Sequence, residues 1–136
     1  MVKNEYINNA LKILKKSHLK ATKQRMSIID IMFLHGASHF TVEEIFNVVN
    51  KKNLKISLAT VYNCINQFVD IGLIKVVKIS SSKVYFDTNL KDHHHFFCMK
   101  SGKLTDIKTN QVKILKLPKL PKGKSLESVE VIINIT

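Results

Sequence analysis

The stretch DTNLKDHHHFF, residues 87–97, contains the side chains of this sequence that are best suited to metal chemistry. Imidazole nitrogens and carboxylate oxygens are common protein ligands of transition metals, and both occur here within one short segment. If the histidines belong to a strand, His93 and His95 project from one face and His94 from the other, because side chains alternate along a strand. The alternative to a metal site is a solvated, histidine-rich turn.

A second strand is expected to bring another carboxylate to the same face. The pattern HHHFFCMKSGKLTDIK predicts two strands joined around Ser101-Gly102. Pairing about that turn places Asp106 opposite Phe97 and diagonal to His95 on one face. Asp87 lies just before the first strand, and enough residues follow it to let the chain fold back. A fifth candidate comes from the loop GASHF, so the expected metal ligands are His39, Asp87, His93, His95 and Asp106.

This ligand set contains nitrogen and oxygen but no sulfur. Such a set suits Fe(II), Mn(II) or Zn(II) in five- or six-coordinate geometry better than a thiolate-rich structural zinc. The two cysteines, Cys64 and Cys98, exclude a four-cysteine structural zinc by counting, and they agree with a reducing compartment. We expect His94 to be exposed to solvent; a secondary metal ligand and a haem ligand are the alternatives.

Helical and strand periodicities define the elements that must position these residues. Apolar spacing predicts four short helices, within residues 5–16, 22–36, 41–52 and 57–72. The third opens on a capping box formed by Thr41 and Glu44, and the fourth opens on Ser57 and ends at Gly72. The segment LIKVVKISSSKVYFDT then alternates, turns at three serines and alternates again, which is typical of a β-hairpin. Helices followed by such a hairpin favour a winged helix-turn-helix.

The fourth helix has one apolar face and one face suited to reading DNA. The apolar set, expected to face the core, is Leu58, Val61, Ile65 and Phe68. Small, hydroxylated and amide side chains near a helix N-terminus can approach base edges in the major groove. The residues expected to face DNA are Ala59, Thr60, Tyr62, Asn63 and Asn66, with Lys20, Lys23, Arg25, Lys51, Lys52 and Lys55 flanking the helix near phosphates. The alternative to DNA binding is an ordinary amphipathic helix whose charged neighbours are only a solvent-exposed surface.

Composition supports a polyanionic partner. The chain of 136 residues carries 22 Lys and Arg against 10 Asp and Glu, a formal charge of +12 with a pI near 9.8. Its hydrophobic fraction of 45% indicates a globular protein, and no apolar run is long enough to span a membrane. The N-terminus lacks the uninterrupted apolar core of a secretion signal, so we expect a cytoplasmic protein.

An enzyme is the main alternative from another functional class. His93, His95 and Asp106 have the composition of a two-histidine, one-carboxylate oxygenase site. Five potential protein ligands leave little room for a substrate, and no arginine stands out to bind a cosubstrate. We therefore expect that the protein is not an enzyme; a nucleic-acid-binding protein without ligand control is a further alternative.

The stretch LKATKQRMSIIDIM…HFTVEEIF…KISLATVYNCINQFVDIGLIKVV…YFDTNLKDHHHFFCMKSGKLTDI resembles the ferric uptake regulator family over roughly residues 10–108. Its strongest elements are SLATVY and the D-x5-H-x-H…D spacing. The resemblance implies an α+β homodimeric repressor that binds a double-stranded DNA operator. It implies an N-terminal winged helix and a small C-terminal α/β dimerisation domain, with regulatory metal ligands falling on the five residues named above. The set is also similar to the peroxide-sensing branch, in which iron-dependent oxidation of histidine is the signal.

The sequence departs from the family pattern at several positions. Ser101 stands where a second cysteine is common, and the further C-terminal cysteine pair is missing, which puts the structural zinc in doubt. These losses and the HHHFF run are similar to the iron response regulator, which senses haem, although the Cys-Pro haem motif is absent; His94 is the possible haem ligand. Asn63 replaces an arginine usual in the recognition helix, so the operator preference is expected to differ.

We expect residues 1–86 to form the DNA-binding domain and residues 87–136 the dimerisation and metal-sensing domain. One divalent ion per subunit would join the two and favour the DNA-binding form of a repressor of iron or peroxide response genes. A haem-responsive regulator is the alternative function. Near the C-terminus, alternation at Val129, Val131 and Ile133 predicts a strand, either at a dimer interface or in the core of a sheet.

Overall fold

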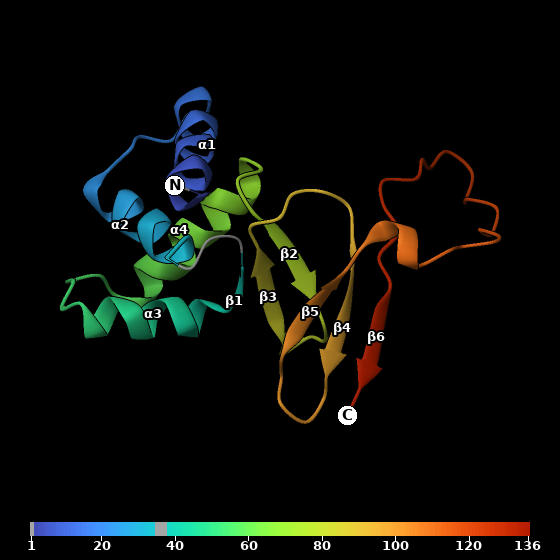
Figure 1. Ribbon diagram of the computed structural model, residues 1–136. Coiled ribbons are helices and arrows are strands. Elements are labelled where there is room, and N and C mark those ends of the chain that lie inside the picture. Colours follow the sequence, from blue (N-terminus) through green and yellow to red (C-terminus); the bar gives the residue numbers. More distant parts are fainter. Residues whose placement is uncertain (1, 35–37) are drawn as a thin grey trace. The chain divides into compact units, whose positions relative to one another are not determined.

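The computed structural model describes residues 2–34 and 38–136. The chain divides into two compact units, Met1–Leu90 and Lys91–Thr136 (Figure 1). The first unit contains α1 (Val2–Lys16), α2 (Lys23–Met32), β1 (His39–Phe40), α3 (Val42–Lys51), α4 (Leu58–Asp70), β2 (Lys75–Lys78) and β3 (Val84–Asp87). The second contains β4 (His94–Cys98), β5 (Leu104–Ile107), the 3-10 turn η1 (Thr109–Gln111) and β6 (Ile132–Ile135).

Helices α2, α3 and α4 begin where the sequence predicts, because the side-chain oxygens of Thr22, Thr41 and Ser57 each accept a hydrogen bond from one of their first free amides. Helix α1 begins at Val2, three residues before the predicted start at Glu5. Thr41 accepts a hydrogen bond from the Glu44 amide (3.1 Å), and Ser57 accepts one from the Thr60 amide (3.1 Å). Helix α4 ends before Gly72, which adopts a positive φ of 76°. The four predicted helices and the predicted caps at Thr41 and Ser57 are confirmed, but α2 ends at Met32, and its predicted end at Gly36 lies outside the described residues.

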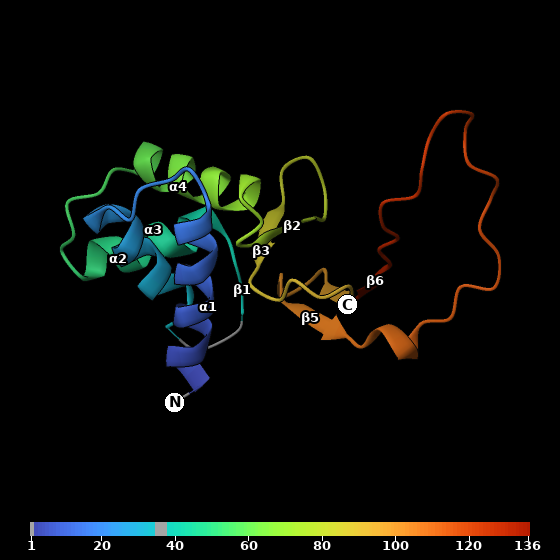
Figure 2. The ribbon, with the colours of Figure 1, turned by 90° about the horizontal axis from the view of Figure 1, so that it is seen from above.

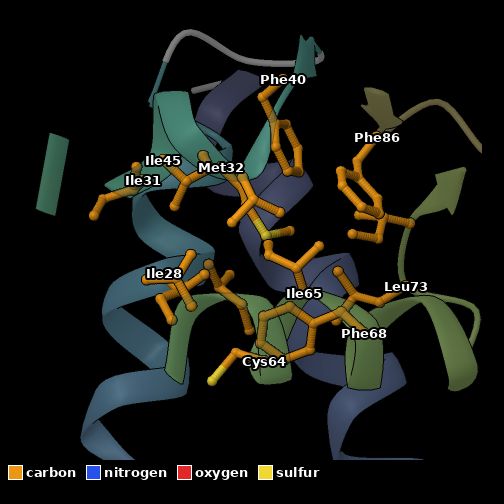
Figure 3. Packing of buried hydrophobic residues seen from close by; sticks show 14 of the residues in the cluster. Ile28, Ile31, Met32, Phe40, Ile45, Cys64, Ile65, Phe68, Leu73 and Phe86 are labelled. Carbon is orange, nitrogen blue, oxygen red and sulfur yellow. The ribbon is translucent and has the colours of Figure 1, made fainter. Parts of the chain in front are cut away.

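The core of the first unit packs the inner faces of α2, α3 and α4 against α1 and the sheet (Figure 3). Ile65 and Phe68 of α4 are fully buried, and the rings of Phe40 and Phe86 stack with centroids 5.9 Å apart. Leu58 is an exception to the predicted apolar face, since it is 39% exposed. Its place in the first turn of α4 carries it past the end of the core, so that prediction is wrong.

The sheet of the first unit has the strand order β1-β3-β2, and all its pairs are antiparallel. The predicted hairpin is confirmed as β2 and β3, which pair from Lys75 opposite Asp87 to Lys78 opposite Val84. The short strand β1 then pairs on the other side of β3, with His39 opposite Asp87. The winged helix therefore ends on a strand that carries a candidate metal ligand.

The sheet of the second unit has the order β5-β4-β6. The strands β4 and β5 are antiparallel, as predicted, but His95 faces Asp106 and Phe97 faces Leu104. The predicted pairing of Asp106 with Phe97 is therefore wrong by two residues. The loop runs from Met99 to Gly102, and Gly102 closes it with a positive φ of 74° rather than standing at its centre.

The C-terminal strand β6 pairs with β4 in parallel, with His95 opposite Ile132. Between η1 and β6, residues 112–131 contain no helix or strand, and Figure 2 shows them as a long excursion of the chain. No helix within residues 2–34 and 38–136 has the length and apolarity needed to cross a membrane.

Candidate metal centre and DNA-reading helix

The first unit places one histidine and one carboxylate together. The Nε2 atom of His39 lies 3.2 Å from Oδ2 of Asp87, and the Asp87 side chain is almost completely buried. The other carboxylate oxygen accepts a hydrogen bond from the Asn89 amide at 2.8 Å. The hydrogen bond between the Ser38 amide and Oγ1 of Thr88 (2.9 Å) holds the two strands together next to this pair. Strand pairing, rather than chain neighbourhood, thus brings His39 to Asp87.

The second unit brings three candidate ligands to one point. Oδ1 of Asp106 lies 3.1 Å from Nε2 of His93 and 3.3 Å from Nε2 of His95. The two imidazole rings meet edge to face, with centroids 4.5 Å apart. Since His95 and Asp106 are direct cross-strand neighbours, β4 and β5 position this cluster, and His93 joins it from just before β4.

The second ring nitrogen of His93 is also positioned. Its Nδ1 lies 2.6 Å from the carbonyl oxygen of Lys91. Because a carbonyl only accepts hydrogen bonds, Nδ1 must carry the proton, and in the neutral ring the lone pair is then on Nε2. Metal-ligating histidines are commonly oriented in this way by a backbone carbonyl. Two imidazole nitrogens and a carboxylate that converge in this manner fit a divalent transition metal.

His94 contradicts the expectation of an exposed side chain. It is buried, and its Nδ1 accepts a hydrogen bond from the Val131 amide at 2.9 Å. The His95 amide donates to the Val131 carbonyl at 3.1 Å, so two adjacent histidines hold the chain that leads into β6. The physical reason is the alternation of β4, which turns His94 away from the cluster and toward the neighbouring strand. One ring nitrogen of His94 is thus engaged in the sheet.

The two cysteines have opposite environments. Hydrogen bonds to Ser101 lower the pKa of the Cys98 thiol, whereas burial raises the pKa of Cys64 despite the nearby charge of Arg25. Both are free thiols. Cys98 has Ser101, rather than a second thiol, as its partner three residues on, so residues 91–136 contain no pair of thiols for a metal.

Helix α4 presents a polar surface next to α3. Ala59, Tyr62 and Asn63 are exposed, as is Asn66, while the Thr60 hydroxyl lies 2.9 Å from that of Ser57. The Tyr62 hydroxyl donates to Oε1 of Glu43 at 2.7 Å, and this hydrogen bond is the largest cause of a raised pKa at Tyr62. Sequence reasoning missed Glu43, because it comes from another helix and nothing in the local pattern marks it.

The basic residues around α4 divide into two kinds. The lysines are exposed: Lys20, Lys23, Lys51, Lys52 and Lys55. Arg25 is half-buried, and its guanidinium donates to the Lys20 carbonyl (2.8 Å) and to Oε1 of Gln67 (3.2 Å). Arg25 therefore braces α2 against α4 within the protein, which the sequence did not indicate.

A winged helix joined to a small sheet with clustered imidazoles and carboxylates defines a class of protein, the metal-responsive regulators of transcription. The particular family follows from comparison with known proteins. A sequence model described as the ferric uptake regulator family matches residues 16–134, and this chain belongs to that family.

Two curated relatives and one solved structure illustrate the similarity. The peroxide-responsive repressor PerR of Staphylococcus epidermidis is 34% identical over 100 residues, covering 74% of this chain and 66% of the relative. A ferric uptake regulation protein of Bordetella parapertussis is 33% identical over 109 residues, covering 76% and 78%. A structure of the ferric uptake regulator from Francisella tularensis with iron superposes with a TM-score of 0.74 at 20% identity, covering 87% of this chain and 91% of that one.

These comparisons confirm the predicted family, the α+β fold and a metal-responsive transcriptional regulator. The family consists of transcription regulators that bind DNA as dimers. The alternative of a haem-responsive regulator finds no support in them.

Proposed function

We propose that this chain is a homodimeric, metal-dependent repressor of iron or peroxide response genes, and that it acts in the cytoplasm on double-stranded operator DNA. On this proposal the protein is not an enzyme, because its polar cluster serves as a regulatory metal site. Family membership supports the class of protein, and the convergence of two imidazoles on the Asp106 carboxylate carries the assignment of metal control.

We assign one divalent ion to both ligand sets. The first unit offers His39 and Asp87, and the second offers His93, His95 and Asp106. Neither set alone completes the five or six ligands that Fe(II) or Mn(II) prefers among nitrogen and oxygen donors. Only residues 88–92 separate Asp87 from His93, a connection of at most about 3.5 Å per residue, and so short a connection would allow both sets to bind the same ion.

We propose a division of labour between two domains. Residues 1–86 would read DNA and residues 87–136 would pair the subunits and sense metal, although the compact units divide after Leu90, which leaves Asp87 in β3. An ion that binds both parts at once stabilises the arrangement in which it has all its ligands, and it disfavours the others by the same free energy. This arrangement would space two copies of α4 to fit successive half-sites of a duplex.

A metal titration tests the proposal. We expect Mn(II) to raise the affinity of the wild-type protein for a duplex that it has selected from random sequences, and a chelator to reverse the effect. His93→Ala should lose this response, because it removes one of the converging nitrogens. His18→Ala is the matched control, since His18 is exposed and lies outside the cluster. Operator binding that is equal with Mn(II), with chelator and in His93→Ala would refute metal control.

Direct sensing of peroxide through the bound ion is a second candidate function, and the similarity to the peroxide-responsive repressor PerR of Staphylococcus epidermidis favours it. Bound iron, unlike manganese, would supply reactivity toward peroxide, and the imidazoles of His39, His93 and His95 would lie beside the ion as its nitrogen ligands. Mass spectrometry of peroxide-treated protein should find an added oxygen on His39, His93 or His95 after loading with Fe(II) but not with Mn(II). Equal oxidation of His18 would show that the reaction is unselective.

A further inference from the structure

The contact between Tyr62 and Glu43 joins the outer faces of two helices. The hydroxyl-to-carboxylate distance is 2.7 Å, which is typical of a charge-assisted hydrogen bond, and Tyr62 is 40% exposed. Glu43 lies in the first turn of α3, where the cap at Thr41 fixes the backbone. The ring of Tyr62 is thus held from outside its own helix, on the surface that the proposed function directs toward DNA.

This hydrogen bond determines what the Tyr62 hydroxyl can do toward another molecule. A tyrosine hydroxyl has one proton to donate and lone pairs that accept. Glu43, as an ionised carboxylate, only accepts, so it takes the single proton. The remaining capacity of the hydroxyl is then that of an acceptor, and the raised pKa of Tyr62 agrees with a proton that is retained in this contact.

An acceptor is selective among the groups that DNA presents. In the major groove, adenine and cytosine offer amino donors, whereas guanine offers only the acceptors N7 and O6 on its edge. Phosphate oxygens are acceptors as well. A hydroxyl whose proton is held by Glu43 can therefore bond an adenine or cytosine amino group, and it gains nothing from guanine or from the backbone. Glu43 also places a negative charge where an unspecific approach of phosphate is repelled.

We propose that Glu43 is a specificity-determining residue, which keeps Tyr62 as a hydrogen-bond acceptor and so directs it to adenine or cytosine. The inference rests on the proposed function, in which α4 faces the bases. Glu43 acts through Tyr62 as a positioning residue, while Tyr62 makes the contact.

Glu44 provides a matched control on the same helix. It is exposed and carries the same charge one residue further on, but its electrostatic influence falls on Tyr85 rather than on Tyr62. Glu44→Gln therefore changes the net charge as Glu43→Gln does and leaves the contact with Tyr62 in place. Glu43→Gln retains a carbonyl oxygen that can accept the tyrosine proton, whereas Glu43→Ala retains neither the charge nor the acceptor.

The experiment selects binding sites for the full chain from a pool of random-sequence duplexes in the presence of Mn(II), and sequences what is retained. We expect the wild-type protein and Glu44→Gln to enrich the same sites. Glu43→Ala should lose preference for adenine or cytosine at one position of each half-site, by roughly tenfold against guanine. Glu43→Gln should retain most of that preference. Tyr62→Phe should lose it at the same position, and Glu43→Ala should have no further effect on selectivity in that background.

The outcomes separate the inference from the proposed function. Should Glu43→Ala enrich the same bases as Glu44→Gln with equal selectivity, Glu43 contributes only charge and the inference is wrong, while the role of α4 stands. Should the wild-type protein enrich no sites, both the inference and the role of α4 in reading DNA are wrong. Glu43 is exposed, so Glu43→Ala is expected to fold, and circular dichroism before the selection verifies this.

Discussion

The two units of this chain differ in how much of their stability they can supply themselves. Among the residues that the structure describes, the main apolar cluster has nineteen buried members, all in the first unit, whereas the second unit buries only Phe97, Leu104 and Ile107 among its apolar side chains. Large apolar side chains exposed in the second unit are Met99, Ile114, Leu115, Leu117, Leu120, Leu126, Ile133 and Ile135. A segment of this size with so small a core is marginal alone. On the proposed function, a bound ion and a second subunit would supply the contacts that this unit lacks.

The largest effect should come from the core of the first unit. Phe68 is completely buried, and Phe68→Ala should lower the free energy of unfolding by about 3–5 kcal/mol, because it removes apolar contacts and leaves a cavity. The exposed Leu115 of the second unit is the contrast, and Leu115→Ala should change monomer stability by less than about 0.5 kcal/mol. Urea unfolding followed by circular dichroism measures both. Equal losses in the two variants would remove the distinction between the units.

Metal should stabilise the second unit next most strongly. At a free Mn(II) concentration about 100-fold above Kd, binding to the native state alone adds about 2.7 kcal/mol. Hydrogen exchange should show this as slower exchange in β4 and β5 of the wild-type protein. In Asp106→Ala, which lacks the carboxylate shared by both imidazoles, Mn(II) should have little effect. Protection confined to the helices of the first unit would contradict the assignment of the ion to the cluster.

A smaller effect is expected where His94 holds the chain before β6. Replacing His94 with Phe keeps a buried ring but leaves the Val131 amide without its acceptor, at a cost of about 1–3 kcal/mol. Faster hydrogen exchange at residues 131–135 would report the loss. His94→Asn is the control, since its side-chain oxygen can accept the same hydrogen bond. Unchanged exchange in His94→Phe would mean that strand pairing alone secures β6.

The smallest change in the fold should accompany Ser101→Ala, which alters reactivity instead. Hydrogen bonds to Ser101 lower the pKa of Cys98, so the thiolate of Cys98 should form at lower pH than an ordinary thiol, and alkylation should rise earlier along a pH series. Ser101→Ala should move that rise to higher pH. Cys64, whose pKa burial raises, should react slowly throughout and serves as the internal reference. An identical pH profile in Ser101→Ala would exclude the hydrogen bond to the Ser101 side chain as the cause.

Local patterns predicted the first unit well, because capping residues and apolar periodicity act over a few neighbours. Thr41 and Ser57 mark helix starts, and the alternation on both sides of Ser80 marks the hairpin. The pairing of β4 with β5 was predicted with the correct faces but shifted by two residues, since the sequence alone did not reveal how the four-residue loop closes. A register shift of two residues keeps every side chain on the same face of the sheet. The prediction that Asp106 lies on the same face as His95 is therefore confirmed despite the wrong register.

Contacts made over a long distance in sequence could not be predicted. The burial of His94 depends on Val131, the bracing role of Arg25 depends on Gln67, and the partner of Tyr62 comes from another helix. Each of these pairs requires knowledge of which elements are neighbours in space. Whether the five candidate ligands share one ion is a property of both units together, and it stays a prediction for the metal titration to decide.

The three consecutive histidines have two different roles, because neighbouring side chains of the run point to opposite faces of the sheet. His93 and His95 contact the carboxylate of Asp106, whereas His94 accepts a hydrogen bond from the Val131 amide, just before β6. Deleting or inserting one residue ahead of the run would turn each histidine to the opposite face of β4. At least one imidazole would still face Asp106 and at least one would still face the chain before β6, because all three residues are histidines. The candidate ion ligands and the contact that holds the last strand therefore lie on opposite faces of the same short segment. A mutation that changes the orientation of β4 should disturb both at once.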